Sequence, residues 1–400
     1  MTRSRLDALI LEQEQIDTLD RESIEAIQLK KLNRLLAQEK KRGGFYRNLP
    51  EKLNSLQELE TLPFTTEEDL AGNAPGLLLT SQSEIRRVLS DATSGTTGRA
   101  KRVFYTEGDL ENTIRLYMAG LGELIFPGSI TMICFPFSGP YGLGELISEA
   151  VTRLGARSLK LGSGLRYGEY REILEREKPD TFVGMPVQLF SILQVCGRGS
   201  LRRALVSGDA MPESVEKGIE KILGSKLFPH YGSREMGMAG AVTCPAHEGM
   251  HLRENMVIAE IIDPEGHVLP KDAYGELVIT TVGMEAMPLI RYRTGDRTRI
   301  LPDPCPCGSA AIRLDRLHRL ERGAEISALD DAVFSVDGVV DACYFRSDEQ
   351  MELQVKTAAS EDAEKITARL RELLPYETIT IHASPASMND RALIAGKRSL

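Results

Sequence analysis

The sequence lacks an apolar run long enough to cross a membrane, a disulfide framework and an excess of basic residues. No stretch of about 18 consecutive apolar residues occurs, so no membrane span is expected. The N-terminal segment MTRSRLDALILEQEQ carries acids and glutamines where a signal peptide needs an unbroken apolar run. Six cysteines in 400 residues do not suggest a disulfide framework. These absences predict a cytoplasmic protein, in which clustered cysteines are first considered as metal ligands.

The charge balance excludes one class of partner. Lysine and arginine number 49 against 58 acidic residues, a net charge of −9, which argues against a nucleic-acid partner. An acidic protein can still bind a nucleotide through a few local cations. The length suggests two or three packed units, and the 42% of hydrophobic residues supply a large core.

Hydrophobic patterns predict an α/β fold. Residues 22–42 place Ile24, Ile27, Leu32 and Leu35 at helical spacing and end in cations followed by Gly43, which predicts a helix. Further on, short apolar runs alternate with helical patterns, which is typical of a mostly parallel sheet. The predicted strands are 130–135, 156–161, 181–186 and 202–209, and the predicted helices include 147–155 and 213–224. Residues 275–282 predict a strand of an additional β-rich portion.

The pattern changes after Cys305-Pro306-Cys307-Gly308. Predicted strands at 342–346, 351–357 and 377–383 surround a predicted helix at 361–374. This is a small α+β unit of a size common for independent domains. We therefore expect two domains, residues 1–315 and residues 316–400.

One loop has the composition of a phosphate-binding loop. It reads TSGTTGRAK and comprises Thr93, Ser94, Gly95, Thr96, Thr97, Gly98 and Lys101. Glycines let the backbone turn its N–H groups toward an anion, hydroxyls add donors, and the lysine adds a charge. The GxxxxGK spacing of a Walker A loop is absent here, and also around Gly396-Lys397, because Arg391 stands where the first glycine belongs. The alternative is a polar turn without a ligand.

Several further motifs accompany this loop. They are Phe45-Tyr46-Arg47, LPFTTEEDL at 62–70, Tyr105-Thr106, YGSREMG at 231–237 and EAMPLIRYRTGD at 285–296. With them the sequence resembles the adenylate-forming superfamily, and within it the phenylacetate–coenzyme A ligase branch. The resemblance implies a large AMP-binding adenylation domain over residues 1–315. It also implies a small C-terminal domain that carries a catalytic lysine segment, here RALIAGKRSL with Lys397.

The resemblance assigns roles to the nucleotide-binding residues. Tyr231 would stack on adenine, and the turn Ser207-Gly208-Asp209 would line the same pocket. Gly232, Ser233 and Arg234 continue the nucleotide motif, and Asp296 would bind the ribose hydroxyls. Arg316, Arg319 and Arg322 compete for a further ribose contact. The alternative for Asp296 alone is a solvated turn aspartate.

The resemblance also assigns the catalytic groups. Glu235 would hold Mg²⁺ on the phosphates together with Thr97, as suits a hard cation. Lys397 would bridge the carboxylate and the α-phosphate, where charge develops in the transition state; the alternative is a frayed basic terminus. The acid-binding wall would include parts of residues 135–142 and of Met185-Pro186, although such residues are more often core.

The implied reaction is ATP-dependent, AMP-forming activation of an aromatic carboxylic acid, followed by thioester formation with coenzyme A. Three departures from the family pattern keep alternatives open: Arg234 replaces a threonine or serine, Arg99-Ala100 precedes Lys101, and the segment 315–327 is short for a hinge. The acyl group could pass to a carrier protein or an amine. The chain could also be a non-catalytic nucleotide-binding relative. A homodimer is left open.

A second set of residues has the chemistry of a zinc site. Cys244 and His251 are separated by six residues, and Cys305 and Cys307 flank Pro306. Three thiolates and one imidazole form a closed tetrahedral site, which is structural and not catalytic. Some members of the branch carry zinc at such positions. His247 is a rival ligand, and isolated buried cysteines are the alternative.

Overall fold

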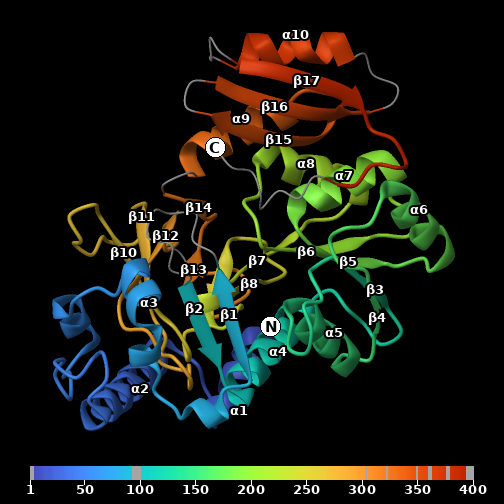
Figure 1. Cartoon of the computed structure of the whole chain (residues 1–400). Coiled ribbons are helices and arrows are strands. Elements are labelled where there is room, and N and C mark those ends of the chain that lie inside the picture. Colours follow the sequence, from blue (N-terminus) through green and yellow to red (C-terminus); the bar gives the residue numbers. More distant parts are fainter. Residues whose placement is uncertain are drawn as a thin grey trace. The chain divides into compact units, whose positions relative to one another are not determined.

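The computed structural model describes residues 4–91, 101–302, 304–320, 323–347, 350–358, 363–374 and 379–392 (Figure 1). The α-helices are α1 Arg5–Glu14, α2 Arg21–Arg42, α3 Glu67–Asn73, α4 Glu107–Leu121, α5 Leu143–Arg153, α6 Tyr167–Arg176, α7 Pro186–Cys196, α8 Glu213–Leu223, α9 Gly323–Phe334 and α10 Ala363–Leu373. Short 3-10 helices are η1 Leu56–Thr61, η2 Ala74–Leu77, η3 Gln82–Glu84 and η4 Arg234–Met236. By contacts the chain divides into two compact units, a first unit of residues 1–123 and 230–320 and a second unit of residues 124–229 and 321–400.

The first unit combines N-terminal helices with antiparallel strands. Strands β1 and β2 form a hairpin, and β10, β11, β12 and β14 form a sheet in that order. The end of β7 pairs with β8, β8 with β9, and β9 with β13. Their bounds are β1 Arg87–Asp91, β2 Lys101–Tyr105, β7 Phe228–Tyr231, β8 Ala241–Thr243, β9 Met250–Leu252, β10 Ile258–Ile262, β11 Gly275–Thr280, β12 Tyr292–Thr298, β13 Arg313–Leu314 and β14 His318–Arg319.

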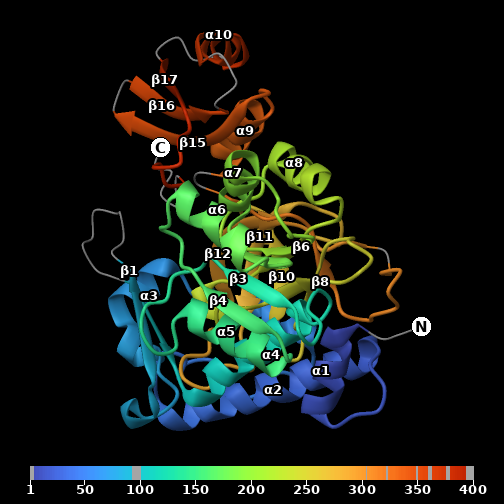
Figure 2. The ribbon, with the colours of Figure 1, turned by 90° about the vertical axis from the view of Figure 1, so that its right-hand side faces the viewer.

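Local chemistry explains where the helices of this unit begin and end. The predicted helix over 22–42 is confirmed as α2 (Figure 2, blue). The Asp20 side chain accepts from Ser23 N in a capping box, and Gly43 ends the helix at φ 72°, where glycine costs least. Helix α4 starts with a second capping box of Thr106 and Asp109.

The second unit contains the parallel strands. They run in the order β4, β3, β5, β6, and β6 pairs with the start of β7. Their bounds are β3 Ile130–Ile133, β4 Arg157–Lys160, β5 Thr181–Gly184 and β6 Arg203–Val206. Each falls inside a predicted strand, so these four predictions are confirmed. The predicted helices are confirmed as parts of α5 and α8.

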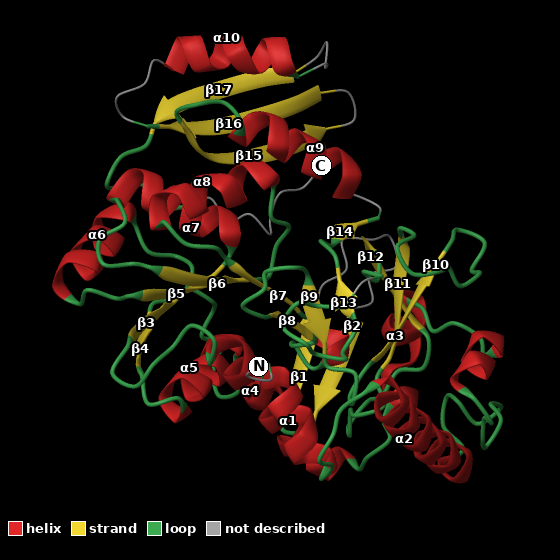
Figure 3. Ribbon diagram, turned by 180° about the vertical axis from the view of Figure 1, so that it is seen from behind, coloured by secondary structure: helices red, strands yellow, loops and turns green. Residues whose placement is uncertain are grey.

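The C-terminal part of the second unit is a three-stranded sheet with two helices (Figure 3). Its strands are β15 Val339–Ser347, β16 Gln350–Thr357 and β17 Ile379–Pro385. Strand β16 pairs antiparallel with β15 and parallel with β17. Helix α10 packs against β17 and α9 against β15. A shared apolar core links Phe190 of α7 and Val215 of α8 to Val333 and Leu370.

The predicted fold class is confirmed: a mixed α/β chain with a parallel sheet, a β-rich portion and a small α+β portion. The division at residue 315 stays a prediction, and by contacts residues 321–400 group with 124–229. None of the helices that the structure describes combines the length and the apolar character that a membrane crossing needs.

Candidate active site

The motif YGSREMG forms a tight bend after β7. Tyr231 ends the strand, and Glu235 lies in η4 four residues later. A Cβ at Gly232 would come 2.5 Å from the Met238 carbonyl oxygen, so glycine is needed there. The Tyr105 hydroxyl donates to the Arg234 carbonyl oxygen at 2.8 Å. The bend is therefore held from β2, the strand that follows the predicted phosphate loop.

Lys101 and Glu235 form a buried ion pair. Lys101 opens β2, its side chain is 14% exposed, and the Glu235 side chain is 5% exposed. Burial acts to raise the pKa of Glu235, but the Lys101 charge and hydrogen bonds outweigh it and lower the pKa below its usual value. Glu235 is thus ionised and offers the oxygen donors that Mg²⁺ prefers.

A second polar group is centred on Asp296 of β12 and includes Tyr231 of β7 and Arg319 of β14. The Tyr231 hydroxyl donates to Asp296 Oδ2 at 2.8 Å, and Arg319 Nε lies 3.2 Å from Asp296 Oδ1. Arg319 also donates to the Thr294 carbonyl oxygen at 2.8 Å. The pairing of β12 with β14, which sets Asp296 opposite Arg319, brings these two side chains together. The result is a buried carboxylate fixed from both sides.

The two groups belong to one electrostatic site. Burial raises the pKa of Asp296, the Arg319 charge opposes this, and Glu235 and Lys101 both contribute through their charges. Lys101, Glu235, Tyr231 and Asp296 thus come together in the first unit from segments far apart in the sequence. Of the two predicted arginines that the structure describes, both are exposed, and Arg319 ion-pairs with Asp296.

In the second unit the turn Ser207-Gly208-Asp209 follows β6. Gly208 has φ 85°, and a Cβ there would meet the Phe135 ring at 2.9 Å. The Met185 side chain lies next to the same point, at 3.7 Å. Phe135 and Met185 are both buried. The structure therefore brings together the predicted turn and two residues of the predicted acid-binding wall.

Three predicted elements lie outside the described residues: the loop residues Thr93 to Gly98, Arg322 and Lys397. Sequence reasoning also assigned no role to Tyr292, whose hydroxyl contacts both Lys101 and Glu235, although it stands in the RYRTGD motif. Nor did it assign one to Asp109, whose carboxylate accepts from Glu285 N at 2.7 Å and Ala286 N at 3.0 Å. Asp109 thereby anchors the segment that leads into β12.

The predicted zinc ligands also come together, in the first unit. The ligand atoms of Cys244, His251, Cys305 and Cys307 lie within 4.8 Å of one another. The sulfurs of Cys244 and Cys305 are 3.6 Å apart, and Cys307 Sγ is 3.4 Å from His251 Nε2. A tetrahedral zinc ion with bonds of about 2.0–2.3 Å separates its ligands by roughly 3.5–3.8 Å. The cluster therefore has the size and donor set of such a site, and His247 is not part of it.

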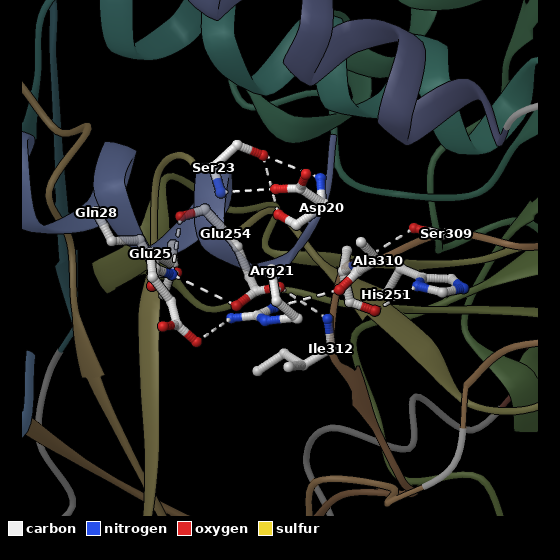
Figure 4. Close-up of polar contacts among 12 residues, drawn as sticks. Asp20, Arg21, Ser23, Glu25, Gln28, His251, Glu254, Ser309, Ala310 and Ile312 are labelled. Carbon is white, nitrogen blue, oxygen red and sulfur yellow. Dashed lines mark hydrogen bonds and ion pairs between the residues drawn. The ribbon is translucent and has the colours of Figure 1, made fainter. Parts of the chain in front are cut away.

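Hydrogen bonds around the cluster hold it from the N-terminal helices (Figure 4). His251 Nδ1 lies 3.1 Å from the Ala311 carbonyl oxygen, which turns Nε2 toward Cys307. Arg21 of α2 pairs with buried Glu254 at 2.6 Å, and Glu254 accepts from Ile312 N at 2.7 Å. Helix α2 thus fixes both segments that carry the cluster.

Comparison with known proteins finds one family and several relatives that match this chain. The profile of the family "AMP-binding enzyme" matches residues 91–286. The phenylacetate–coenzyme A ligase of Thermus thermophilus is 30% identical over 323 residues, which cover 76% of this chain and 71% of that protein. The enzyme of the same name from Aromatoleum evansii is 30% identical over 320 residues, covering 72% and 69%.

The fold is also found among solved structures. A 2-hydroxyisobutyryl–coenzyme A ligase in its post-adenylation state, in complex with 2-HIB-AMP, superposes with a TM-score of 0.77. Its identity is 19%, with 96% of this chain and 90% of that chain covered. At this identity the match shows the fold alone.

Proposed function

Because the chain belongs to the adenylate-forming AMP-binding enzymes, in their phenylacetate–coenzyme A ligase branch, we propose how its own residues carry out the AMP-forming ligation of a carboxylic acid to coenzyme A. ATP and the acid give an acyl-adenylate and pyrophosphate, and the thiol of coenzyme A then displaces AMP. The proposed acid is aromatic, and the proposed acceptor is coenzyme A itself.

The juxtaposition in the first unit carries this proposal. A cation, Lys101, and a buried ionised carboxylate, Glu235, lie beside a second buried carboxylate, Asp296, that a tyrosine and an arginine orient. The Lys101–Glu235 pair suits the phosphates of ATP, and the second carboxylate suits the ribose hydroxyls. Hydroxyls of a ribose can donate to Asp296 once Tyr231 and Arg319 have fixed its orientation.

In the proposed first half-reaction, the substrate carboxylate attacks the α-phosphorus and pyrophosphate leaves. Lys101 and the loop Thr93 to Gly98 bind the phosphates, and Lys397 steadies the charge that develops between the carboxylate and the α-phosphate. Glu235 and Thr97 would hold Mg²⁺, which would neutralise charge on the phosphates. Tyr231 stacks on adenine, and Gly232, Ser233 and Arg234 shape that side of the site. In the second half-reaction, binding brings the thiol to the adenylate.

The aromatic acid has two kinds of support. Relatives covering most of this chain are named phenylacetate–coenzyme A ligases. In the second unit, Phe135 and Met185 pack against the turn at Gly208, which supplies an apolar lining for an acid next to the turn predicted to line the adenine pocket. Apolar and aromatic side chains are the usual lining of small-molecule sites, which is compatible with an aromatic ring on the acid.

We further propose that Cys244, His251, Cys305 and Cys307 bind a structural zinc ion. All four positions of a tetrahedral ion are then protein ligands, so no position is open for a substrate. The hydrogen bond from His251 Nδ1 to Ala311 favours the tautomer that coordinates through Nε2.

The test is product analysis with purified protein over a panel of aromatic, aliphatic and amino acids. The proposal expects AMP release that requires both an aromatic acid and coenzyme A, with one thioester formed per AMP. If an adenylate forms but AMP release requires a carrier protein or an amine, that molecule is the acceptor and the assignment of coenzyme A is wrong. ATP binding without pyrophosphate release for any acid would reject the enzymatic proposal.

A further inference from the structure

A buried tyrosine hydroxyl lies beside the ion pair of the candidate site and contacts both of its members. Lys101 Nζ donates to the Tyr292 hydroxyl at 3.3 Å, and that hydroxyl donates to Glu235 Oε1 at 3.4 Å. Tyr292 is 2% exposed. The hydroxyl uses its proton toward the carboxylate and a lone pair toward the ammonium, so it satisfies both partners at once.

The backbone of Tyr292 is fixed from two sides. It pairs with Ile279 of β11 and forms a parallel bridge with Thr65. Hydrogen bonds of 3.0 Å join Thr65 N to the Arg291 carbonyl oxygen and Arg293 N to the Thr65 carbonyl oxygen. The ring is therefore carried by a strand in a paired sheet, and such a support holds a side chain more firmly than a loop does.

We infer that Tyr292 is a positioning residue for the metal-binding carboxylate, and this rests on the proposed function of Glu235. When nucleotide binds, Lys101 can turn from Glu235 to a phosphate, whereas the Tyr292 hydroxyl continues to hold Oε1. The carboxylate then keeps the orientation in which it can bind Mg²⁺. Groups that orient a metal ligand in this way typically change metal affinity by about 10–100-fold when removed.

The ion pair also couples the metal to the nucleotide. Mg²⁺ alone would take Glu235 from Lys101 and leave the largely buried ammonium with its longer carboxylate contact, to Glu67 at 3.9 Å. ATP alone would draw Lys101 to its phosphates and leave the Glu235 carboxylate to repel their negative charge. Each ligand therefore favours the other, and by linkage the effect is reciprocal. Tyr292 affects this coupling through the affinity of the Glu235 carboxylate for Mg²⁺.

The experiment measures ATP binding by titration calorimetry at graded Mg²⁺ concentrations, so it does not depend on turnover. Tyr292→Phe keeps the ring and removes the hydroxyl. The matched control is Tyr170→Phe, which also removes a buried hydroxyl with two partners but lies in the second unit: it donates to the Gly162 carbonyl oxygen at 3.4 Å and accepts from Gln188 Nε2 at 3.0 Å.

For Tyr292→Phe we expect the Mg²⁺ midpoint to rise about tenfold, while ATP affinity at saturating Mg²⁺ stays within about twofold. Tyr170→Phe should leave the midpoint unchanged. The inference is overturned if the Tyr292→Phe midpoint does not move, if Tyr170→Phe moves it equally, or if ATP affinity falls at every Mg²⁺ concentration. Wild-type protein that binds Mg²⁺ and ATP but activates no acid would overturn the proposed function and leave this inference standing.

Discussion

Arg316 and Arg319 have the same side chain, lie three positions apart and are both exposed, but they differ in their contacts. Arg319 ion-pairs with Asp296 and donates to the Thr294 carbonyl oxygen, whereas the Arg316 backbone N donates to Asp315 Oδ1 at 2.8 Å. The sequence left this choice open because it depends on the register between β12 and β14. A shift of one residue would turn the other face of the strand to Asp296.

Arg319→Ala should therefore weaken nucleotide binding. Loss of a charge-assisted contact that orients the ribose carboxylate costs on the order of 1.5 kcal/mol, which is about tenfold in the KM for ATP. Arg316→Ala is the matched control and should leave that KM within about twofold. Equal effects of the two substitutions, or a larger effect of Arg316→Ala, would show that Arg319 is not the ribose-side arginine.

Glu39 is a buried carboxyl that the proposed chemistry does not use. It is 1% exposed, and neither oxygen has a hydrogen-bond partner in the part of the chain that the structure describes. Burial raises its pKa from 4.5 to about 7, with the nearby Arg42 charge opposing the rise. Ionised Glu39 is therefore disfavoured in the folded protein.

This gives a pH dependence of stability with a definite sign. Below about pH 4.5 Glu39 is protonated in both the folded and the unfolded protein, so its ionisation does not lower the free energy of unfolding. As pH rises toward 7 only the unfolded form ionises, and above 7 the loss of stability is complete, on the order of 1–3 kcal/mol. In Glu39→Gln this part of the fall in unfolding free energy between pH 5 and 8 should disappear. It should persist in Glu22→Gln, on an exposed position of the same helix; persistence in both variants would refute the assignment.

At the scale of elements, the spacing of apolar residues determined which helices and strands the sequence could predict. Short apolar runs predicted β3 to β6, and an amphipathic period predicted α2 and α8. Helix α7 was not predicted beyond a strand ending at Pro186, because residues from Val187 to Leu193 are buried on every face and show no polar side. It packs both against α8 and against β15, which the chain reaches about 150 residues later.

The cysteine cluster shows the same limit. The sequence supplied the ligand types, but neither half has a CxxC spacing, and His247 was a rival to His251. The pairing of β13 with β9, which sets Arg313 opposite His251, brings the Cys305 and Cys307 segment to His251. Long-range register, and not local spacing, selects the fourth ligand.

Cys305→Ser should remove the zinc and destabilise the first unit. We expect metal analysis to fall from about one zinc per chain to well below it, with a lower thermal unfolding midpoint, because metal binding contributes folding free energy. The control is Cys343→Ser, a half-buried cysteine of β15 in the second unit, which should retain the zinc. Purified wild-type protein with far less than one zinc, even without chelators, would refute the zinc proposal.

At the scale of the whole molecule, the family and the fold class were predictable because several motifs occur together in the right order. RYRTGD alone could be a turn, and GTTG alone could be a polar loop. Together with YGSRE they predict adenylation and not phosphoryl transfer. The contacts of individual residues were less predictable: Tyr292, inside RYRTGD, and Asp109, between the motifs, act through contacts with Glu235 and with Glu285, which no local pattern reveals.

The most direct test of the central claim is acid-dependent ATP–pyrophosphate exchange in wild-type protein and in Glu235→Gln. Glutamine keeps the size of the side chain but removes the charge that binds Mg²⁺ and pairs with Lys101. We predict exchange in the wild type with an aromatic acid, reduced by a factor on the order of 100 or more in the variant. Exchange that survives unchanged in Glu235→Gln, or that is absent from the wild type for every acid, would contradict the account.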